Sequence, residues 1–351
     1  MTHLEVCAVK RLACCSALIG LLVFSLPLAA QDDAKKPLPK TIGSIERLDP
    51  SFDKIVPADG EIEVLGGLFD WSEGPVWVEK GSYLLFSDIP PNRIMKWEAG
   101  KGVTLFAEAV GYSGDKPYTG KEPGTNGLAL DSQGRLVMCC HGDRSIKRMT
   151  LPDGKPETIA DKYDGKRFNS PNDLVYHSSG GLYFTDPPYG LPKGADDPAR
   201  ETEWFGVYRL GKDGKVTLLT KEMTRPNGIG FSPDEKTLYV AQSDPAAAVV
   251  KAFPVKEDGT LGESRVFFDA TKWVKDRPGL PDGLAVDKEG RVWVTGPGGV
   301  YCITAEGKVL GRLNTGVPTA NCKFGEDGST LFITADMYLA KVKTNTKGLG
   351  F

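Results

Sequence analysis

Two stretches of the chain repeat one pattern and decide the fold: RPNGIGFSPDEKTLYVAQSD at residues 225–244 and LPDGLAVDKEGRVWVTGPGG at residues 280–299. Each places an Asn or Asp and then a Gly before a short apolar alternation, and a polar turn leads into a second apolar run. An alternation of period two, a turn, and a run rich in β-branched and aromatic residues predict a β-hairpin. The residue before the glycine differs, being Asn227 in the first stretch and Asp282 in the second.

The pattern occurs six times along the chain. Its lead residues lie 53, 46, 55, 55 and 39 positions apart, and they are Glu73, Asn126, Asn172, Asn227, Asp282 and Asn321. These intervals bracket the repeat of roughly 40–50 residues that is typical of propeller blades. Further strand-like runs follow the hairpins, such as RIMKW and VTLFAE after the first one, so a repeat supplies four strands. We therefore predict an all-β, six-bladed β-propeller.

The sixth repeat is one strand short, because only YLAKVKT follows TLFITA. We predict that the segment EIEVLGG, from Glu61, supplies the missing strand and closes the last blade, which leaves no open sheet edge. The predicted organisation is a signal peptide over residues 1–30, a linker or N-terminal arm over 31–60, and the propeller over 61–351.

The N-terminus carries an export pattern. Lys10 and Arg11 precede the apolar run LACCSALIGLLVFSLPLAA, which ends in the small residues Ala29 and Ala30. This order is typical of a secretory signal peptide, and it predicts a protein of the periplasm or the cell exterior, with no membrane contact after cleavage. An uncleaved membrane anchor is the alternative, because the run approaches the length of a spanning helix.

Composition narrows the classes of partner. The formal net charge is −3 and the sequence has no block of basic residues, so nothing in its charge favours a nucleic acid or an anionic membrane. After the signal segment the cysteines are Cys139, Cys140, Cys302 and Cys322, none in a C-x-x-C spacing, and their pairing is left open. We expect a small-molecule substrate and a monomer or weak oligomer.

The lead residues are expected to meet in space. In a propeller the innermost strand of each blade lines the central channel, and the lead residue begins that strand, so all six should ring one mouth. Residues that end the second strand of each hairpin are expected at the same mouth, namely Asp88, His141, Asp186, Ser243 or Asp244, and Gly296. The hairpin turns then lie at the opposite face.

The chemistry of this ring is that of oxygen donors. Carboxylate and amide oxygens suit Ca²⁺, which takes six to eight oxygen ligands, and Mg²⁺ or Mn²⁺ remains open. Zn²⁺ is less favoured, because the only histidines after the signal segment are His141 and His177, and His177 falls near a turn on the other face. The alternative is that each Asn caps a turn.

Several motifs resemble a known family. WSEGPVW at 71–77, RFNSPND at 167–173, RPNGIGF at 225–231 and PDGLAVD at 281–287 are similar to blocks of the gluconolactonase/regucalcin (senescence marker protein) family of six-bladed propellers, in its bacterial gluconolactonase-like branch. The likeness runs from about Glu61 to the C-terminus.

The resemblance implies a divalent cation, commonly Ca²⁺, held by Glu73, Asn172, Asn227 and Asp282, which are four of the six lead residues. It implies hydrolysis of a sugar lactone to an aldonic acid, with Asp282 also serving as general base or nucleophile. Asn126 and Asn321 then face the substrate or support the ligands.

Three further residues are candidates for the site. His141 ends a strand at the mouth and titrates near neutrality, so it is a candidate to relay a proton or hold the substrate; a rim histidine bonded to solvent or to Asp143 is the alternative. Arg225 and Asn169 flank the ligand loops and are candidates for substrate binding, with packing or surface pairing as the alternative for Arg225.

Two rival functions stay open. A metal-dependent phosphotriesterase uses the same kind of propeller site, and fold alone does not separate it from a lactonase. A non-catalytic ligand-binding propeller is less favoured, because it does not need both acids at one mouth. The sequence has no G-x-S-x-G motif, so it gives no support to a serine hydrolase.

Overall fold

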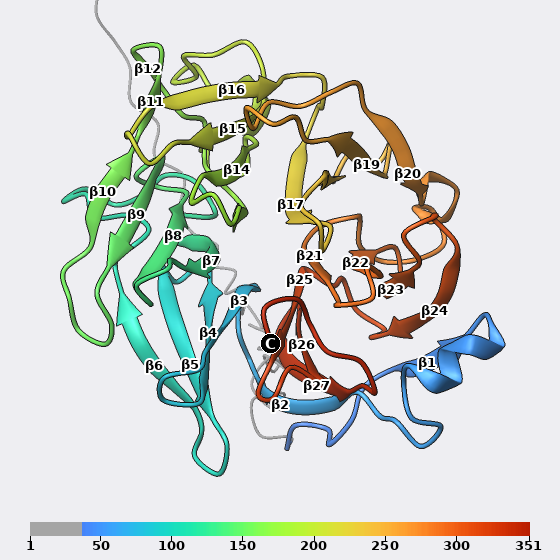
Figure 1. The fold of residues 1–351 in the computed structure, drawn as a ribbon. Coiled ribbons are helices and arrows are strands. Elements are labelled where there is room, and N and C mark those ends of the chain that lie inside the picture. The colour runs from blue at the N-terminus through green and yellow to red at the C-terminus, as the bar shows by residue number, and fades with distance from the viewer. Residues whose placement is uncertain (1–36) are drawn as a thin grey trace, which may run out of the picture. The chain divides into compact units, whose positions relative to one another are not determined.

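The computed structural model describes residues 37–351, which form a ring of β-sheets around a central axis (Figure 1). The predicted signal peptide lies outside these residues. Three short 3₁₀ helices accompany the strands: η2 (Pro50–Lys54), η3 (Gly194–Asp196) and η4 (Thr271–Trp273). Among the described residues no helix has the length and apolar character needed to cross a membrane.

The blades follow the chain in order, each with its inner strand first. Blade one contains β3 (Ser72–Val78), β4 (Tyr83–Asp88), β5 (Arg93–Glu98) and β6 (Gly102–Glu108). Blade two contains β7 (Thr125–Leu130), β8 (Leu136–Cys140), β9 (Ser145–Met149) and β10 (Glu157–Ala160). Blade three contains β13 (Leu174–Tyr176), β14 (Leu182–Asp186), β15 (Gly206–Leu210) and β16 (Val216–Thr220). A small hairpin of β11 (Lys162–Tyr163) and β12 (Lys166–Arg167) separates blades two and three.

The second half of the ring follows the same plan. Blade four contains β17 (Pro226–Phe231), β18 (Thr237–Gln242), β19 (Val249–Pro254) and β20 (Arg265–Asp269). Blade five contains β21 (Leu284–Val286), β22 (Val292–Gly296), β23 (Gly299–Ile303) and β24 (Val309–Asn314). Blade six contains β25 (Asn321–Gly325), β26 (Thr330–Ala335), β27 (Tyr338–Lys343) and, from the N-terminal side, β2 (Glu63–Gly67). The six-bladed all-β prediction is confirmed.

The N-terminal strand closes the ring as predicted. β2 pairs antiparallel with β27, with Glu63 opposite Lys341 and Val64 opposite Ala340. The closure joins the two ends of the propeller in one sheet, so the edge that β27 would otherwise expose is hydrogen-bonded.

The core is divided among the interfaces between neighbouring blades. Six apolar clusters occur, one at each interface, and each combines residues of two adjacent sheets. Between blades six and one, for example, Phe332 packs against Trp97 and stacks on Trp77, with ring centroids 5.3 Å and 5.7 Å apart. Because both faces of the blades are covered, most residues of the inner two strands of each blade are buried, whereas the outermost strands are partly exposed.

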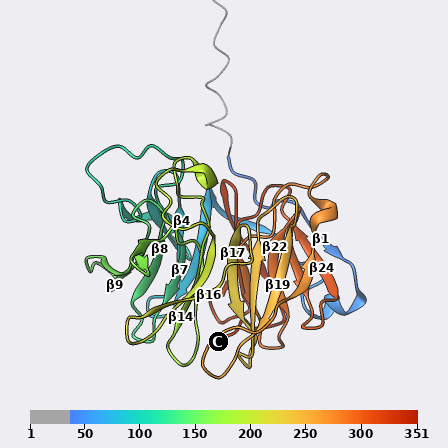
Figure 2. The same cartoon turned by 90° about the horizontal axis from the view of Figure 1, so that it is seen from above.

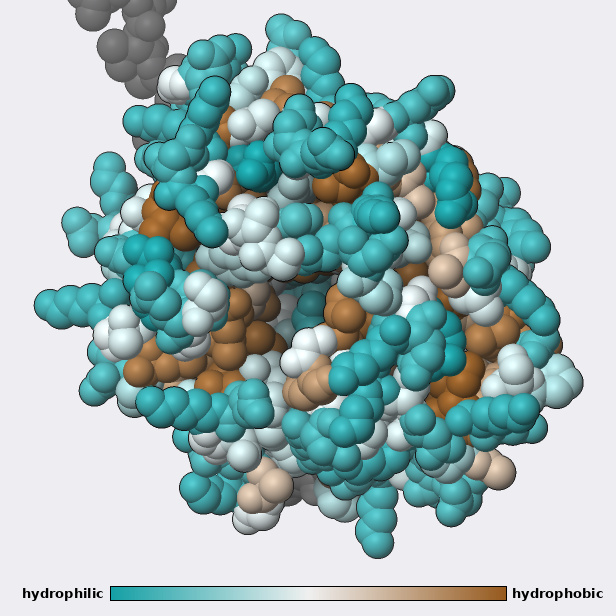
Figure 3. All heavy atoms as spheres, in the orientation of Figure 1, coloured by the Kyte–Doolittle hydropathy of each residue, from teal (hydrophilic) through white to brown (hydrophobic). Residues whose placement is uncertain are grey.

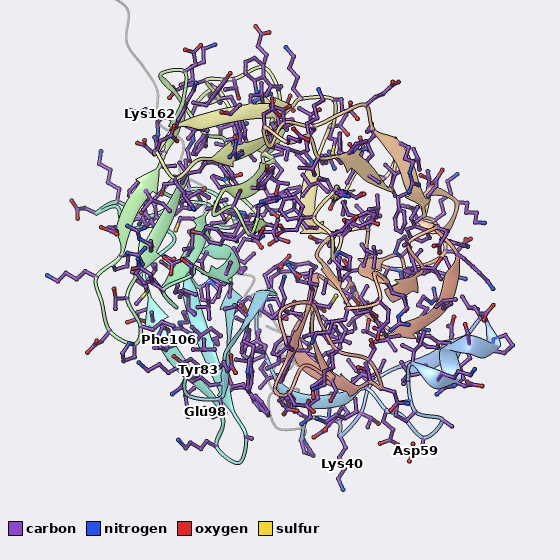
Figure 4. All side chains as sticks on the ribbon, in the orientation of Figure 1. Lys40, Asp59, Tyr83, Glu98, Phe106 and Lys162 are labelled. Atoms are coloured by element: carbon purple, nitrogen blue, oxygen red, sulfur yellow. The ribbon has the colours of Figure 1, made fainter. Side chains whose placement is uncertain are left out.

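The segment predicted as a linker or arm contains a strand. β1 (Ser44–Arg47) pairs with β24 and becomes a fifth strand of blade five. Glu46 accepts hydrogen bonds from the guanidinium of Arg312 at 2.6 and 3.1 Å, and Phe52 of η2 is fully buried. The labelled residues Lys40 and Asp59 mark this arm at the outside of the ring (Figure 4).

The two ends of the channel differ. The C-terminus lies at one end (Figure 2), where the hairpin turns surround a hollow that is visible at the centre of the ring (Figure 3). This hollow has a volume of about 1110 Å³ and is lined by turn residues, by residues 349–351 and by Lys323 of β25. The predicted site residues begin the inner strands and so lie at the other end.

Candidate functional site

Five of the six lead residues line one cavity of about 490 Å³. They are Glu73, Asn126, Asn172, Asn227 and Asp282. The sixth, Asn321, does not line the cavity, but its Nδ2 donates to Glu73 Oε2 at 3.2 Å. The repeat phase therefore identified side chains from separate blades that the fold does bring together.

A glycine follows most lead residues, and at these positions the next blade packs too closely for a side chain. A Cβ at Gly228 would lie 2.1 Å from the carbonyl oxygen of Asp282, and a Cβ at Gly127 would lie 2.8 Å from that of Asn172. The same two glycines donate their N–H groups to these carbonyls, at 3.1 Å and 2.7 Å. At these two positions the lead-Gly pair joins an inner strand to the next lead residue and fixes their spacing through the backbone.

Glu73 is held by two donors. Its Oε2 accepts from the backbone N–H of Gly74 at 2.8 Å and from Asn321 Nδ2, which leaves Oε1 for a ligand. The residue is only 2% exposed, and burial raises the pKa of Glu73 to about 8, with the charge of Asp173 adding to the shift. An ionised Glu73 in this position needs a positive charge beside it.

Asp282 faces the same problem. Burial raises the pKa of Asp282 well above its ordinary value, and the negative charge of Glu73 raises it further. Its backbone is fixed, since the N–H donates to Thr295 Oγ1 at 3.1 Å. Nearby, Asn227 Nδ2 donates to Ser243 Oγ at 2.8 Å, which orients the amide and leaves its oxygen available.

Three amide or carboxylate oxygens of this cavity are buried without any hydrogen-bond partner among the described residues. They are Asn126 Oδ1, Asn172 Oδ1 and Asp282 Oδ1. Buried polar atoms are nearly always satisfied in folded proteins, so three unpartnered acceptors around one cavity indicate a missing positive or donor group. In the described part of the chain no three His, Cys, Asp or Glu side chains gather as a metal-ligand cluster. The donor set here is instead two carboxylates with amide oxygens, which fits a hard cation such as Ca²⁺.

A third carboxylate lies in the channel and was not predicted. Asp173 follows Asn172 directly, is 5% exposed, and its Oδ1 accepts from the N–H of Leu174 at 2.9 Å. Burial raises the pKa of Asp173, while the positive charge of Lys323 lowers it. Lys323 also lines the hollow at the far end of the channel.

Most residues that end the second strands lie at the predicted end of the channel without lining the cavity. Among them only Ser243 lines the cavity. Asp88 Oδ1 accepts from the N–H groups of Asp70 and Trp71, and the Asp186 carboxylate accepts from those of Asn169 and Ser170. These carboxylates therefore hold the loops that lead into the inner strands.

Asn169 belongs to the same supporting network. Its side-chain nitrogen donates to Asp186, Thr202 and the carbonyl of Trp204, and the residue is fully buried away from the cavity. The structure therefore does not support the predicted role in substrate binding. Arg225 does line the cavity, together with Arg277, which the sequence did not single out.

His141 lies behind the cavity wall. It is fully buried and does not line the cavity, and the carboxylate of Glu122 stands 3.4 Å from its Nδ1. Glu122 and Tyr189 do line the cavity. Sequence reasoning missed both, because each lies in a connection between strands where no periodic pattern marks its position.

Comparison with known proteins identifies the family of this chain. The model of the family described as "SMP-30/Gluconolactonase/LRE-like region" matches residues 71–336. The chain belongs to this family. A gluconolactonase of Zymomonas mobilis is 39% identical over 313 residues, which cover 88% of each chain.

Solved structures show the same relationship. A gluconolactonase of Xanthomonas campestris superposes with a TM-score of 0.75 at 32% identity, over 88% of this chain and 99% of the other. A calcium-binding protein, regucalcin, of Agrobacterium tumefaciens superposes with a TM-score of 0.63 at 22% identity, over 82% and 94%. The second likeness concerns the fold alone.

Proposed function

We propose that this protein hydrolyses sugar lactones to aldonic acids with the help of a divalent cation, Ca²⁺ being the best fit. The relatives that carry the reaction in their names, the gluconolactonases of Zymomonas mobilis and Xanthomonas campestris, support a lactonase-type hydrolase. A pentonolactonase of Haloferax volcanii, 27% identical over 271 residues, supports the same reaction class. The cation and the roles of individual residues are inferred from the site.

The observation that carries the proposal is the group of unpartnered oxygens. Asn172 Oδ1 and Asp282 Oδ1 are buried without partners in the cavity that Glu73 and Asn227 also line. Glu73, Asn172, Asn227 and Asp282 would hold the cation through two carboxylates and two amide oxygens. Their two negative charges nearly balance a divalent ion, and so remove the cost of burying both acids.

When bound, the cation supplies a Lewis acid that polarises the lactone carbonyl. Asp282, whose carboxylate lines the cavity, would also act as general base and take a proton from the attacking water. The water oxygen adds to the carbonyl carbon, the bond from that carbon to the ring oxygen breaks, and the ring oxygen takes up a proton as the new hydroxyl. Asn126 Oδ1, also unpartnered, is available to a substrate hydroxyl.

The direct test is a pH-stat assay of glucono-δ-lactone on protein stripped with chelator, followed by return of Ca²⁺, Mg²⁺, Mn²⁺ or Zn²⁺. Opening of the lactone near neutral pH releases one proton for each molecule, so acid release reports turnover. We expect no turnover above the spontaneous rate after stripping, and recovery with Ca²⁺. Full activity in chelator would refute the metal-dependent mechanism. Turnover of paraoxon without turnover of any lactone would favour the phosphotriesterase.

A further inference from the structure

We propose that Glu122, positioned by His141, binds the hydroxyl groups of the lactone ring and so selects polyhydroxylated lactones over unsubstituted ones. This inference rests on the proposed function, which it extends by assigning the residues that distinguish one class of lactone from another. Neither residue belongs to the set proposed to hold the cation.

Glu122 enters the cavity from the connection between β6 and β7, and its side chain is 34% exposed. Two backbone hydrogen bonds hold this connection against the end of β8. The N–H of His141 donates to the carbonyl of Gly124, and the N–H of Gly142 donates to that of Pro123, both at 3.1 Å. The distance from Glu122 to His141 is therefore fixed by the backbone on both sides.

His141 is an unusual buried residue. Its side chain is fully buried, and neither ring nitrogen makes a hydrogen bond among the described residues. The charged group beside it is the Glu122 carboxylate, with Oε2 3.4 Å from Nδ1. Gly190 packs on the histidine so closely that a Cβ there would lie 2.5 Å from His141 Cβ. In this proposal the packed ring positions the Glu122 carboxylate, which is the acidic group that stands beside its Nδ1.

The rest of the cavity wall near Glu122 also lacks partners. Tyr189 Oη and Asn126 Oδ1 are both buried without a hydrogen bond, and both residues line the cavity with Glu122. A carboxylate, a phenol and an amide oxygen together accept several hydrogen bonds and donate one. A ring that carries several hydroxyl groups supplies this complement, and an unsubstituted lactone ring leaves all three groups unsatisfied.

Charge argues for hydroxyl groups rather than an anionic group at this position. Glu122 adds a third carboxylate to a cavity that the carboxylates of Glu73 and Asp282 also line, so an anionic group of the substrate would be repelled there. The cavity's arginines, Arg225 and Arg277, come from blade four and from the connection before blade five. Blade five stands opposite blade two in a ring of six, so the arginines and Glu122 lie on different sides of the cavity. The Glu122 side offers hydrogen-bond acceptors, and a neutral donor such as a hydroxyl group is the ligand that matches it.

The test compares glucono-δ-lactone with δ-valerolactone, which has the same ring and no hydroxyl groups. The variants are Glu122→Gln, Glu122→Asp and His141→Gln. Glu235→Gln is the matched control, because Glu235 lies 3.5 Å from His177 in a similar pair at the opposite mouth. Each variant is assayed with saturating Ca²⁺, and its melting temperature confirms that it is folded.

We expect Glu122→Gln to lower kcat/KM for glucono-δ-lactone about 10- to 100-fold, mainly through KM, and to leave δ-valerolactone within about twofold of wild type. His141→Gln is expected to give a smaller loss of the same kind. The double variant Glu122→Gln/His141→Gln should have the same kcat/KM as Glu122→Gln alone, since His141 acts through the Glu122 carboxylate. Glu235→Gln should match wild type for both substrates.

Two results would overturn the inference. One is an equal loss for both lactones, which would place Glu122 in the chemistry or the fold rather than against a hydroxyl; the other is no loss for either. If the Glu122 variants do not fold, the wild-type protein alone still tests the inference. Equal KM values for δ-valerolactone and glucono-δ-lactone would show that the cavity has no site for the hydroxyl groups. Failure of the proposed function looks different, since wild type would then open neither lactone.

Discussion

Replacement of Asp282 by Asn is expected to raise stability in the absence of calcium and to reduce the stability that calcium adds. In the free protein Asp282 Oδ1 is buried without a partner, and burial together with the charge of Glu73 raises its pKa well above the ordinary value. Relieving an uncompensated buried charge is worth about 3 kcal/mol. The amide keeps the shape of the side chain and removes this cost.

The expected shift in melting temperature follows from the size of the propeller, Leu38–Phe351. An unfolding entropy of about 2 cal/mol/K per residue gives about 0.6 kcal/mol/K for roughly 300 residues, so 3 kcal/mol corresponds to about 5 °C. In chelator the Asp282→Asn protein should therefore melt about 5 °C above wild type. With Ca²⁺ at about 1,000 times its Kd, wild type gains about 4 kcal/mol, and the variant, which has lost a charged ligand, gains less at the same concentration.

Differential scanning calorimetry in chelator and in a series of Ca²⁺ concentrations measures both effects, and the pH-stat assay measures turnover. Because the variant lacks the proposed base, its turnover should fall by orders of magnitude and should not recover at saturating Ca²⁺. Asp234→Asn is the control: this carboxylate accepts from Ser232 and Lys236 in a hairpin turn, and its replacement should leave the calcium response unchanged. A variant that melts below wild type in chelator would refute the reasoning that the free site is strained by its own charge.

Three further predictions follow from the same geometry. Glu73→Gln should weaken Ca²⁺ binding about 10- to 100-fold, as measured by isothermal titration calorimetry, and excess Ca²⁺ should restore much of the hydrolysis rate. A variant that stays inactive at saturating Ca²⁺ would show that Glu73 does more than bind the ion. Burial raises the pKa of Glu73 from 4.5 to about 8, so between these pH values the free folded protein holds a proton that the unfolded chain has lost. The stability of the free protein should therefore fall as the pH rises across this window, while its Ca²⁺ affinity should rise by up to about tenfold per pH unit. A Ca²⁺ affinity that does not depend on pH would contradict this. Gly228→Ala would place a Cβ 2.1 Å from the Asp282 carbonyl oxygen, so it should lower the free energy of unfolding in denaturant by about 2–4 kcal/mol and weaken Ca²⁺ binding. In the control Gly214→Ala the new Cβ has no atom within 4 Å, so the variant should lose about 1 kcal/mol and bind Ca²⁺ as wild type does.

The parts of the molecule that repeat could be read from the sequence. Hairpins at a regular interval predict blades, and the lead residue of each hairpin has the same place in each blade, so Glu73 and Asp282 could be assigned to one mouth although 209 positions separate them along the chain. Closure by the segment at Glu61 followed from counting strands, because the sixth repeat had one too few. In both cases periodicity carried information over long sequence distance.

The parts that do not repeat could not be read in this way. Glu122 and Tyr189 lie in irregular connections whose course depends on contacts such as that between His141 and Gly124. The roles of Asp186 and Asn169 could not be read from the sequence for another reason. A polar residue near the end of a strand can face the cavity, or it can hold the neighbouring loop through hydrogen bonds. The sequence carries the residue type but not the direction of the side chain.

The lead-Gly pair connects the fold to the proposed chemistry through one backbone contact. Where Gly127 and Gly228 donate to the lead carbonyls of Asn172 and Asp282, neighbouring inner strands approach so closely that no room is left for a Cβ. The contact also sets the spacing between neighbouring lead side chains. Lead residues on so tightly packed a ring cannot move apart to relieve the repulsion between Glu73 and Asp282, and Asn321 holds Glu73 in place as well. Packing of the channel mouth thus keeps two acids together at a cost that the proposed cation would remove, so the closure of the ring would contribute to the affinity for that ion.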